Sequence, residues 1–300
     1  MSKIEEAIKN LFLMSNDTLM PITLDNITSY LAKNNVSYSV AIPFEFTKPI
    51  NEEFVGMDFF TSYANFDDKT VPVLVLKAPY TVDVDKLILI AADFIKLENR
   101  DSIVSNPFEW IDKWKEIFGD SIKKKMVFDV IGELLALKTF YLKNKTLKWV
   151  GQEKGTHDIV GENNIYEVKS TLKKTENVVG IHSSYQLSND KDTKLVFVRL
   201  EKKPHSSLSI NLLLKDLISL GYDSNELEKS LEFIGFKIGN RLRDDTYDLL
   251  SLYIYDVTID NFPIISIEDI NKYAPHNNIL GYELKVDLTP IEKTILFEKE

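Results

Sequence analysis

The sequence predicts an α/β protein with a mixed central sheet flanked by helices. Apolar residues recur at spacings of three and four in some segments, which is typical of helices, and alternate with polar residues in others, which is typical of half-buried strands. In the middle of the chain these segments follow the order helix, three strands, short helix, strand. This order favours helices packed against a mixed sheet.

The first part of the chain, residues 1–119, is expected to form an N-terminal α+β region. Alternating apolar residues predict a strand over residues 38–46, and a second strand is expected over 71–76. Residues 85–97 and 107–118 have the pattern of helices. No residue of this region suggests chemistry.

Residues 120–204 are expected to form the core domain. A helix is predicted over 123–142, because five apolar residues repeat at helical spacing with no intervening proline: Val127, Val130, Leu134, Leu137 and Tyr141. The strands expected after it cover residues 147–150, 156–160, 165–170 and 194–200, with a short helical stretch before the last.

Residues 205–300 are expected to form a C-terminal α/β extension. A helix over 208–220 ends at Gly221, and Ser224 is the expected N-cap of a second helix that reaches about residue 234. Strands are predicted over 249–258 and 282–288.

The composition excludes several classes of protein. The 300 residues include no cysteine, so disulfide scaffolds, thiolate metal sites and cysteine nucleophiles are ruled out. The longest apolar run, residues 87–92, is far shorter than the ~18 residues that cross a bilayer. The first residues lack the apolar core of a secretion signal. We therefore expect a cytoplasmic protein with no membrane partner.

Charge is distributed unevenly along the chain. The formal net charge is −10, which argues against a protein that coats nucleic acid by bulk electrostatics. Residues 121–175, however, hold 11 lysines against 6 acidic residues, a balance of +5. A charge run alone is more often a solvated face than a binding surface. The basic segment becomes informative only together with the side chains that it contains.

Two carboxylates and a lysine are expected to meet at the predicted hairpin. If residues 161–164 form its loop, Asp158 lies directly opposite Glu167. Side chains opposed in this way have β-carbons ~5 Å apart, so the two carboxylates repel each other unless a cation lies between them. Because side chains alternate along a strand, Lys169 shares the face of Glu167. An odd-numbered loop would reverse this arrangement.

The preceding helix carries another acid, Glu133, on or beside its apolar stripe. It follows Val130 by three residues and precedes Leu137 by four. Taken alone, such a glutamate is more often solvated at the edge of the stripe than part of a site. Its interpretation therefore depends on the hairpin.

These residue types suit hydrolysis of a phosphodiester. Carboxylate oxygens are the ligands that Mg²⁺ prefers, and Mn²⁺ is expected to substitute for it. Lys169 beside such a metal would orient an attacking water and stabilise charge that develops on the phosphate. Other signals are missing from the sequence: it has neither an HExxH motif, nor a Walker-type loop, nor a GxGxxG motif.

The combination of these residues resembles the PD-(D/E)XK nuclease superfamily, whose core has the order αβββαβ, as in restriction endonucleases. The resemblance is closest over residues 127–200, to a poorly characterised bacterial branch encoded near restriction and defence genes. The segments that carry it are Gly132-Glu133-Leu134-Leu135, Trp149-Val150-Gly151, His157-Asp158-Ile159-Val160, Tyr166-Glu167-Val168-Lys169-Ser170, Ile181-His182-Ser183-Ser184-Tyr185-Gln186-Leu187 and Leu195-Val196-Phe197-Val198-Arg199-Leu200. One departure is Thr156-His157, which stands where the name-giving proline would precede the aspartate.

The resemblance implies a role for each matching residue. Asp158 and Glu167 match the family's metal ligands, with the Val168 carbonyl as a third, and Lys169 matches the catalytic lysine. Glu133 matches the helical acid that completes the metal shell. Three further residues are candidate nucleic-acid contacts: Ser170, Lys173 and Lys174. Gln186 matches a glutamine that supports the site or contacts substrate.

The leading expectation is a Mg²⁺-dependent DNA endonuclease of a bacterial restriction or phage-defence system. The modest basic segment favours a partner, such as a helicase, an ATPase or a methyltransferase, that delivers the DNA. Cleavage of both strands would favour a homodimer. Two alternatives stay open: a catalytically inactive DNA-binding or assembly subunit that keeps the nuclease fold, and a nuclease that acts on RNA or modified DNA.

Overall fold

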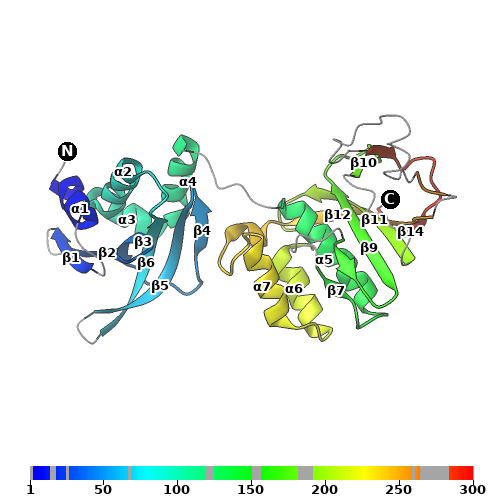
Figure 1. Cartoon of the computed structure of the whole chain (residues 1–300), viewed down its shortest axis with the longest axis horizontal. Helices are drawn as coiled ribbons and strands as arrows, with labels where there is room; N and C mark the ends of the chain where they lie inside the picture. Colours follow the sequence, from blue (N-terminus) through cyan, green and yellow to red (C-terminus); the bar gives the residue numbers. More distant parts are fainter. Residues whose placement is uncertain are drawn as a thin grey trace, which may run out of the picture. The chain divides into compact units, whose positions relative to one another are not determined.

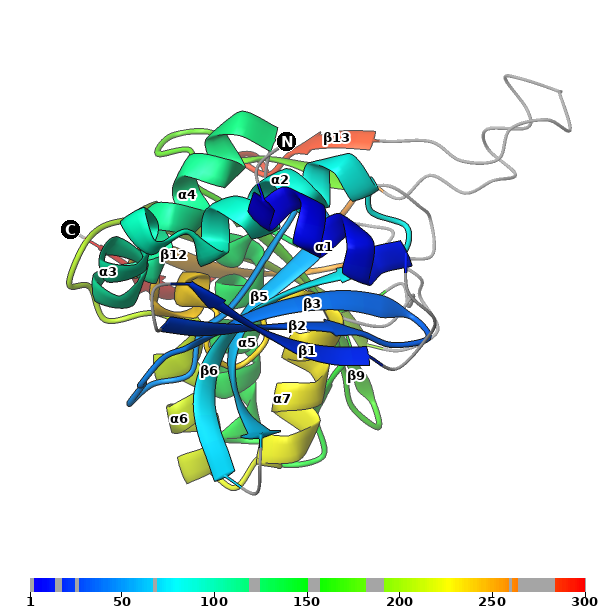
Figure 2. The same cartoon turned by 90° about the vertical axis from the view of Figure 1, so that its left-hand side faces the viewer.

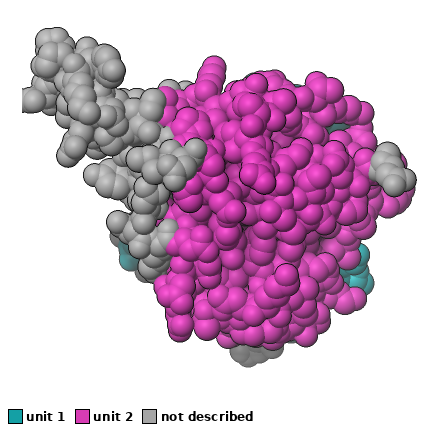
Figure 3. Space-filling view, turned by 90° about the vertical axis from the view of Figure 1, so that its right-hand side faces the viewer, with its two compact units in different colours: residues 1–122, 237–241 teal, residues 123–236, 242–300 magenta. Residues whose placement is uncertain are grey.

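A computed structural model of the chain shows two compact units, each with its own sheet (Figure 1). Unit 1 comprises residues 1–122 and 237–241, and unit 2 comprises residues 123–236 and 242–300, whose surface is shown in magenta in Figure 3. The structure describes residues 3–13, 18–24, 27–66, 69–118, 125–150, 157–181, 192–258, 261–263 and 284–299.

Unit 1 is built on a six-stranded antiparallel sheet. Its strands are, in spatial order, β1 (Thr18–Leu24), β2 (Ile27–Lys33), β3 (Ser37–Pro43), β6 (Lys69–Pro79), β5 (Met57–Phe66) and β4 (Asn51–Phe54). The strands expected over residues 38–46 and 71–76 are β3 and β6. They lie side by side at the centre of the sheet.

Four helices cover one face of this sheet (Figure 2). They are α1 (Lys3–Leu13), α2 (Val84–Ile95), α3 (Leu97–Ser105) and α4 (Pro107–Phe118). The indole of Trp110 on α4 stacks on Phe59 of β5, with ring centroids 5.5 Å apart. Trp110 and Trp114 are both buried, so this pair belongs to the core of unit 1.

Five residues from far along the chain complete unit 1. The backbone N–H of Arg241 donates to Oε1 of Glu52 at 3.0 Å, and its guanidinium pairs with Asp112. Gly239 accepts at its carbonyl from the N–H of Asn51 at 3.0 Å. Its φ of +90° lies in the left-handed region, which favours glycine. Residues 237–241 are therefore an integral piece of this unit.

Unit 2 contains a mixed six-stranded sheet, as predicted. Its strands are, in spatial order, β14 (Thr294–Glu298), β12 (Tyr247–Asp256), β11 (Asp192–Lys202), β9 (Asn164–Thr171), β8 (Ile159–Val160) and β7 (Lys148–Trp149). Only β9 and β11 run parallel, and the other neighbours are antiparallel. A separate pair, β10 (Val178–Ile181) and β13 (Leu284–Asp287), forms a small antiparallel sheet.

The described helices of unit 2 are α5 (Val127–Tyr141), α6 (Ile210–Ser219) and α7 (Ser224–Phe233). The short 3₁₀ turn η2 (Arg241–Asp244) follows them. Its first residue, Arg241, is the last residue of the segment that belongs to unit 1. Helix α5 is buried on nearly every side, because its own apolar residues lie on all of its faces and not in a single stripe. Its core is shared with α6, α7 and the sheet. Strand β12, from the expected C-terminal extension, pairs directly with β11.

One predicted cap was wrong. Asp223, not Ser224, caps α7, since its Oδ1 accepts from the N–H of Glu226 at 2.8 Å. Both residue types cap helices well, and the aspartate keeps the extended backbone that an N-cap requires. The N-cap of α6 is Ser209, whose Oγ accepts from the N–H of Leu212 at 3.2 Å.

Two expected elements of the core fall partly or wholly outside the described residues. The strand expected over 156–160 appears as β8, with residues 151–156 outside the described part of the chain. A short helix was expected between the strands over 165–170 and 194–200. The described part of this interval, residues 171–181, contains strand β10 and no helix, and residues 182–191 lie outside the described part. Within the described segments, no helix has both the length and the apolar character needed to cross a bilayer.

Candidate active site

The hairpin of β8 and β9 has the register that the sequence predicted. Ile159 pairs with Tyr166 and Val160 pairs with Ile165. The N–H of Gly161 donates to the carbonyl of Asn164 at 2.8 Å and closes the loop. Asp158 directly precedes β8, so this register brings it opposite Glu167.

The two faces of β9 have different environments. Tyr166 stacks on Phe140 of α5, with ring centroids 4.3 Å apart, so the even-numbered side chains of β9 face this helix. Alternation places Glu167 and Lys169 on the opposite face. There the ammonium of Lys169 lies 2.8 Å from Oε1 of Glu167. Glu167 is only 4% exposed, so this ion pair is largely withdrawn from water.

Glu133 is buried in the interior of unit 2, not solvated at the edge of a stripe. It is 4% exposed, and both of its carboxylate oxygens are engaged. Oε2 accepts from the indole N–H of Trp149 at 2.8 Å, and Oε1 accepts from the ammonium of Lys125 at 2.5 Å. Helix α5 buries this glutamate because nearly all of the residues around it on the helix are apolar.

Asp158 connects the helix acid to the hairpin. Its Oδ1 accepts from the ammonium of Lys125 at 3.1 Å, and its Oδ2 accepts from the backbone N–H of Val168 at 2.8 Å. Lys125 therefore bridges Asp158 and Glu133, and Val168 ties Asp158 to the strand that carries Glu167. Asp158 lies between the two ion pairs of the site.

The electrostatics of the site favour a bound cation. Burial, and then the charge of Asp158, raise the pKa of Glu133 to about 8, and the same two causes raise the pKa of Glu167 to about 8. Burial also raises the pKa of Asp129, one helical turn before Glu133, to about 6. Burial disfavours the charged form of Lys125, but Glu133 and Asp158 outweigh it and raise the pKa of Lys125 above its ordinary value.

The oxygens fit a hard divalent cation by chemistry, but in this structure a lysine lies between two of them. Among the described residues, no three acidic or histidine side chains converge closely enough to hold a metal ion. Glu133 and Asp158 converge on the ammonium of Lys125 instead. The side chain of Val168 is packed in the core, so only its backbone carbonyl is a possible ligand.

A glycine allows α5 to lie close to β9. A β-carbon at Gly132 would lie 2.0 Å from Oγ of Ser170 and 3.2 Å from its Cβ. This close approach sets the position of Glu133, the next residue on the helix. It also buries the Ser170 hydroxyl, for which the described residues offer no hydrogen-bond partner. The Ser170 hydroxyl therefore faces the helix in this structure, and its contact with a phosphate stays a prediction.

The remaining predicted contacts lie at the surface or outside the described residues. Lys173 pairs with Glu176 at 2.5 Å and Lys174 pairs with Glu201 at 2.5 Å. Both lysine side chains are about two-thirds exposed, and such pairs contribute little to stability. Gln186 lies outside the described residues.

The side chains of this site form one cluster: Lys125, Asp129, Glu133, Trp149, Asp158, Glu167 and Lys169. The sequence analysis missed three of them, Lys125, Asp129 and Trp149. Asp129 precedes Glu133 by four residues, a spacing that places both on one helix face. Trp149 occurs in a segment that resembles the nuclease superfamily, but nothing in the sequence connects it to Glu133. Lys125 precedes the helix, and its contact with Asp158 joins residues 33 positions apart.

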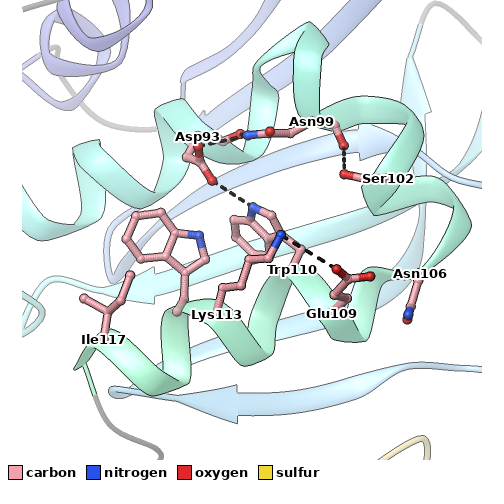
Figure 4. A pocket seen from close by; sticks show the side chains of 9 residues that line it. Asp93, Asn99, Ser102, Asn106, Glu109, Trp110, Lys113 and Ile117 are labelled. Carbon is pink, nitrogen blue, oxygen red and sulfur yellow. Dashed lines mark hydrogen bonds and ion pairs between the residues drawn. The ribbon is translucent and has the colours of Figure 1, made fainter.

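A cavity of about 300 Å³ in unit 1 has a different character (Figure 4). It lies along Trp110 and Trp114, and its polar side chains bond to one another. Trp110 Nε1 donates to Oδ2 of Asp93 at 3.0 Å, and Asn99 donates to the same aspartate at 2.9 Å. The acid and the lysine that pair here, Glu109 and Lys113, lie 3.8 Å apart and are about two-thirds exposed. The acids of the hairpin and of α5 that pair with a lysine are buried instead, so we place the candidate chemistry in unit 2.

Comparison with known proteins identifies one family. Residues 88–281 match the family model described as "Putative PD-(D/E)XK family member, (DUF4420)". The match covers more than half of the chain and includes the hairpin and helix α5. No curated protein and no solved structure matches the chain.

Proposed function

Because the chain belongs to the family DUF4420, which is described as a "Putative PD-(D/E)XK family member", we propose that it is a divalent-metal-dependent endonuclease that hydrolyses phosphodiester bonds in DNA. The observation that carries this proposal is the position of Asp158, between the buried Glu167–Lys169 pair and Glu133. Buried carboxylates that repel each other lower the stability of the folded protein. Such groups next to a lysine are therefore typical of functional sites.

Five residues of the site have a role in the proposed reaction. Asp158 and Glu167 would hold Mg²⁺, or Mn²⁺ in its place, with the Val168 carbonyl as a third ligand, and Glu133 would complete the shell. When bound, such a metal polarises the phosphate and acidifies a water. Lys169 would orient the attacking water and stabilise charge that develops on the phosphate. The water gives up a proton to the solvent as its oxygen bonds to phosphorus, the ester bond to the leaving oxygen breaks, and the leaving oxygen takes up a proton from the solvent.

The substrate and the setting are also part of the proposal. The basic segment and the resemblance favour DNA, delivered by a helicase, an ATPase or a methyltransferase of a bacterial restriction or phage-defence system. A balance of +5 over residues 121–175 gives only modest affinity, so activity of the isolated chain should be weak and sensitive to salt.

One observation favours an alternative, a non-catalytic assembly subunit that keeps the nuclease fold. Both lysines of the cluster pair with its acids without a metal: Lys125 pairs with Glu133 and Asp158, and Lys169 pairs with Glu167. A site that has lost its metal could be held together in this way.

Plasmid cleavage separates the two possibilities. Supercoiled DNA is incubated with the protein in Mg²⁺, in Mn²⁺ and in EDTA, alongside Asp158→Asn and Lys169→Met. Lys138→Met is the matched control, since Lys138 lies on α5 but pairs with Asp216, outside the cluster. We expect nicking by the wild type and by Lys138→Met that EDTA and the two site variants abolish. Equal nicking by all four proteins would contradict the assignment, and a parallel assay on RNA tests the substrate class.

A further inference from the structure

Two carboxylates of the candidate site are directed at the same ammonium group. Oε1 of Glu133 and Oδ1 of Asp158 lie 2.5 Å and 3.1 Å from Nζ of Lys125. One of these acids lies on a helix and the other directly precedes a strand, so their meeting point is a product of the fold. The group at that point is a cation supplied by the chain itself.

Each of these carboxylates is also held by a second donor through its other oxygen. Trp149 donates to Oε2 of Glu133, and the backbone N–H of Val168 donates to Oδ2 of Asp158. If Lys125 moved away, both carboxylates would keep their orientation. Oε1 of Glu133 and Oδ1 of Asp158 would then face the position that Lys125 had left. Two oriented carboxylate oxygens at one position can serve as the first two ligands of a metal ion.

Lys125 is better placed to withdraw than the other lysine of the cluster. It lies outside helix α5, before the N-cap residue Met126, so its backbone is held in neither a helix nor a strand. Lys169, in contrast, is fixed within β9 between two paired strands. A lysine side chain is a flexible stem with a strongly hydrated head, so leaving the site returns its ammonium to water.

The charges of the cluster favour exchange for a divalent ion. Among the described residues, two ammonium groups pair with three carboxylates of the site: Lys125 with Glu133 and Asp158, and Lys169 with Glu167. A fourth acid, Asp129, interacts electrostatically with both lysines. One monovalent cation between Glu133 and Asp158 leaves an excess of negative charge when all four acids are ionised. A divalent cation neutralises more of it at the same position.

We propose that Lys125 is an internal cation that occupies the position between Glu133 and Asp158 in the metal-free protein and is displaced when a divalent metal binds. This proposal rests on the proposed function, since it concerns the same site. Lys125 therefore sets the metal affinity: it stabilises the empty cluster and competes with the ion for two of its oxygens.

Metal binding to charge variants tests the proposal without any cleavage assay. Titration calorimetry with Mn²⁺ is performed on the wild type, Lys125→Met, Lys125→Arg and the control Lys138→Met. We expect Lys125→Met to bind Mn²⁺ at least ten-fold more tightly than the wild type. Lys125→Arg, which keeps the positive charge, and Lys138→Met should stay within about two-fold of the wild type.

Thermal unfolding gives an independent readout on the same proteins. Without metal, Lys125→Met should melt at a lower temperature than the wild type, because Glu133 and Asp158 lose their shared cation. Saturating Mn²⁺ should raise its melting temperature by more than it raises that of the wild type. If Lys125→Met does not fold without metal, Lys125→Gln, which keeps a donor at this position, replaces it in both measurements.

The outcomes distinguish this proposal from the proposed function. Equal or weaker Mn²⁺ binding by Lys125→Met, with wild-type binding that Asp158→Asn abolishes, would overturn the role of Lys125 and leave the nuclease assignment intact. Tighter Mn²⁺ binding by Lys125→Met that persists when Asp158→Asn is added would also overturn the role of Lys125, because the ion would then bind elsewhere. No Mn²⁺ binding by any variant would overturn both.

Discussion

The indole N–H of Trp149 and the carboxylate of Glu133 form a hydrogen bond of 2.8 Å in the interior of unit 2. It joins strand β7 at the edge of the sheet to helix α5. Both groups are almost fully buried, at 1% and 4% exposure, so water cannot replace either partner. This bond fixes one oxygen of Glu133 and directs the other toward the site.

Replacing Trp149 by phenylalanine should therefore destabilise the protein by roughly 1–3 kcal/mol beyond the loss of packing, because a buried acceptor loses its donor. The matched control is Trp110→Phe, whose acceptor Asp93 is 28% exposed at its side chain and can turn to water. Urea unfolding of both variants measures the difference. Equal losses would show that the bond to Glu133 contributes no more than an ordinary partly exposed one.

Gly132→Ala should be more harmful than a helix-stabilising substitution usually is. Its β-carbon would meet Ser170, so α5 must shift away from β9, at a cost of roughly 1–3 kcal/mol. The shift would move Glu133 as well and lower Mn²⁺ affinity. Calorimetric titration and urea unfolding measure both effects.

The control for this substitution is Ser170→Ala. It removes a buried hydroxyl that has no hydrogen-bond partner among the described residues, so we expect stability equal to the wild type or slightly higher. Combined with Gly132→Ala, it should recover part of the loss. An unchanged Gly132→Ala protein would contradict the close approach of α5 and β9.

The stability of the metal-free protein should fall as the pH rises. Burial, and then Asp158, raise the pKa of Glu167 from its ordinary 4.5 to about 8, so between these values the folded state binds more protons than the unfolded state. The stabilisation is complete below pH 4.5 and is lost as the pH rises through 8. Thermal melts in EDTA across this range measure the slope.

Glu167→Gln should flatten this slope and stabilise the metal-free protein near pH 8, by about 2–4 °C in melting temperature for each kcal/mol gained. Mn²⁺ should have the opposite pH dependence in the wild type, because it binds the deprotonated carboxylates and raises the melting temperature more at pH 8.5 than at pH 6. A Glu167→Gln protein that melts below the wild type at pH 8 without metal would contradict the strained state of this carboxylate.

Lys173→Ala and Lys174→Ala should weaken DNA binding without affecting stability. Their ion pairs are exposed, so each substitution should change the free energy of unfolding by less than about 0.5 kcal/mol. Each lost phosphate contact should reduce the slope of log affinity against log salt by about 1. Lys148→Ala is the control, because Lys148 is equally exposed, at 67%, and pairs with Glu226. A loss of binding in the control equal to that in the two variants would point to general electrostatics.

The sequence sufficed for the hairpin but not for the whole cluster. The register of β8 and β9 follows from the even-numbered loop, because side-chain alternation allows only two outcomes and the apolar Ile159 and Tyr166 must both face the core. The pairing of Lys169 with Glu167 follows from the same alternation. Local rules decide these contacts, and the sequence contains those rules.

The sequence did not predict the contacts that depend on tertiary packing. Glu133 was expected to be solvated when taken alone, because the stripe on one face of α5 did not show that the other faces are buried too. Lys125 contacts Glu133 and Asp158, and these contacts depend on the direction in which the chain enters α5. Most of unit 1 was missed for a similar reason, since β1, β2, β4 and β5 become strands through their neighbours in one sheet.

The return of residues 237–241 to unit 1 limits how the chain can be dissected. A fragment that stops at residue 122 would lack the N–H that Arg241 donates to Glu52, a carboxylate that is 1% exposed. The complementary fragment would carry these five residues with nothing to receive them. No single cut yields both halves whole, so an exchange of the N-terminal half between related proteins must transplant two separate stretches of sequence together.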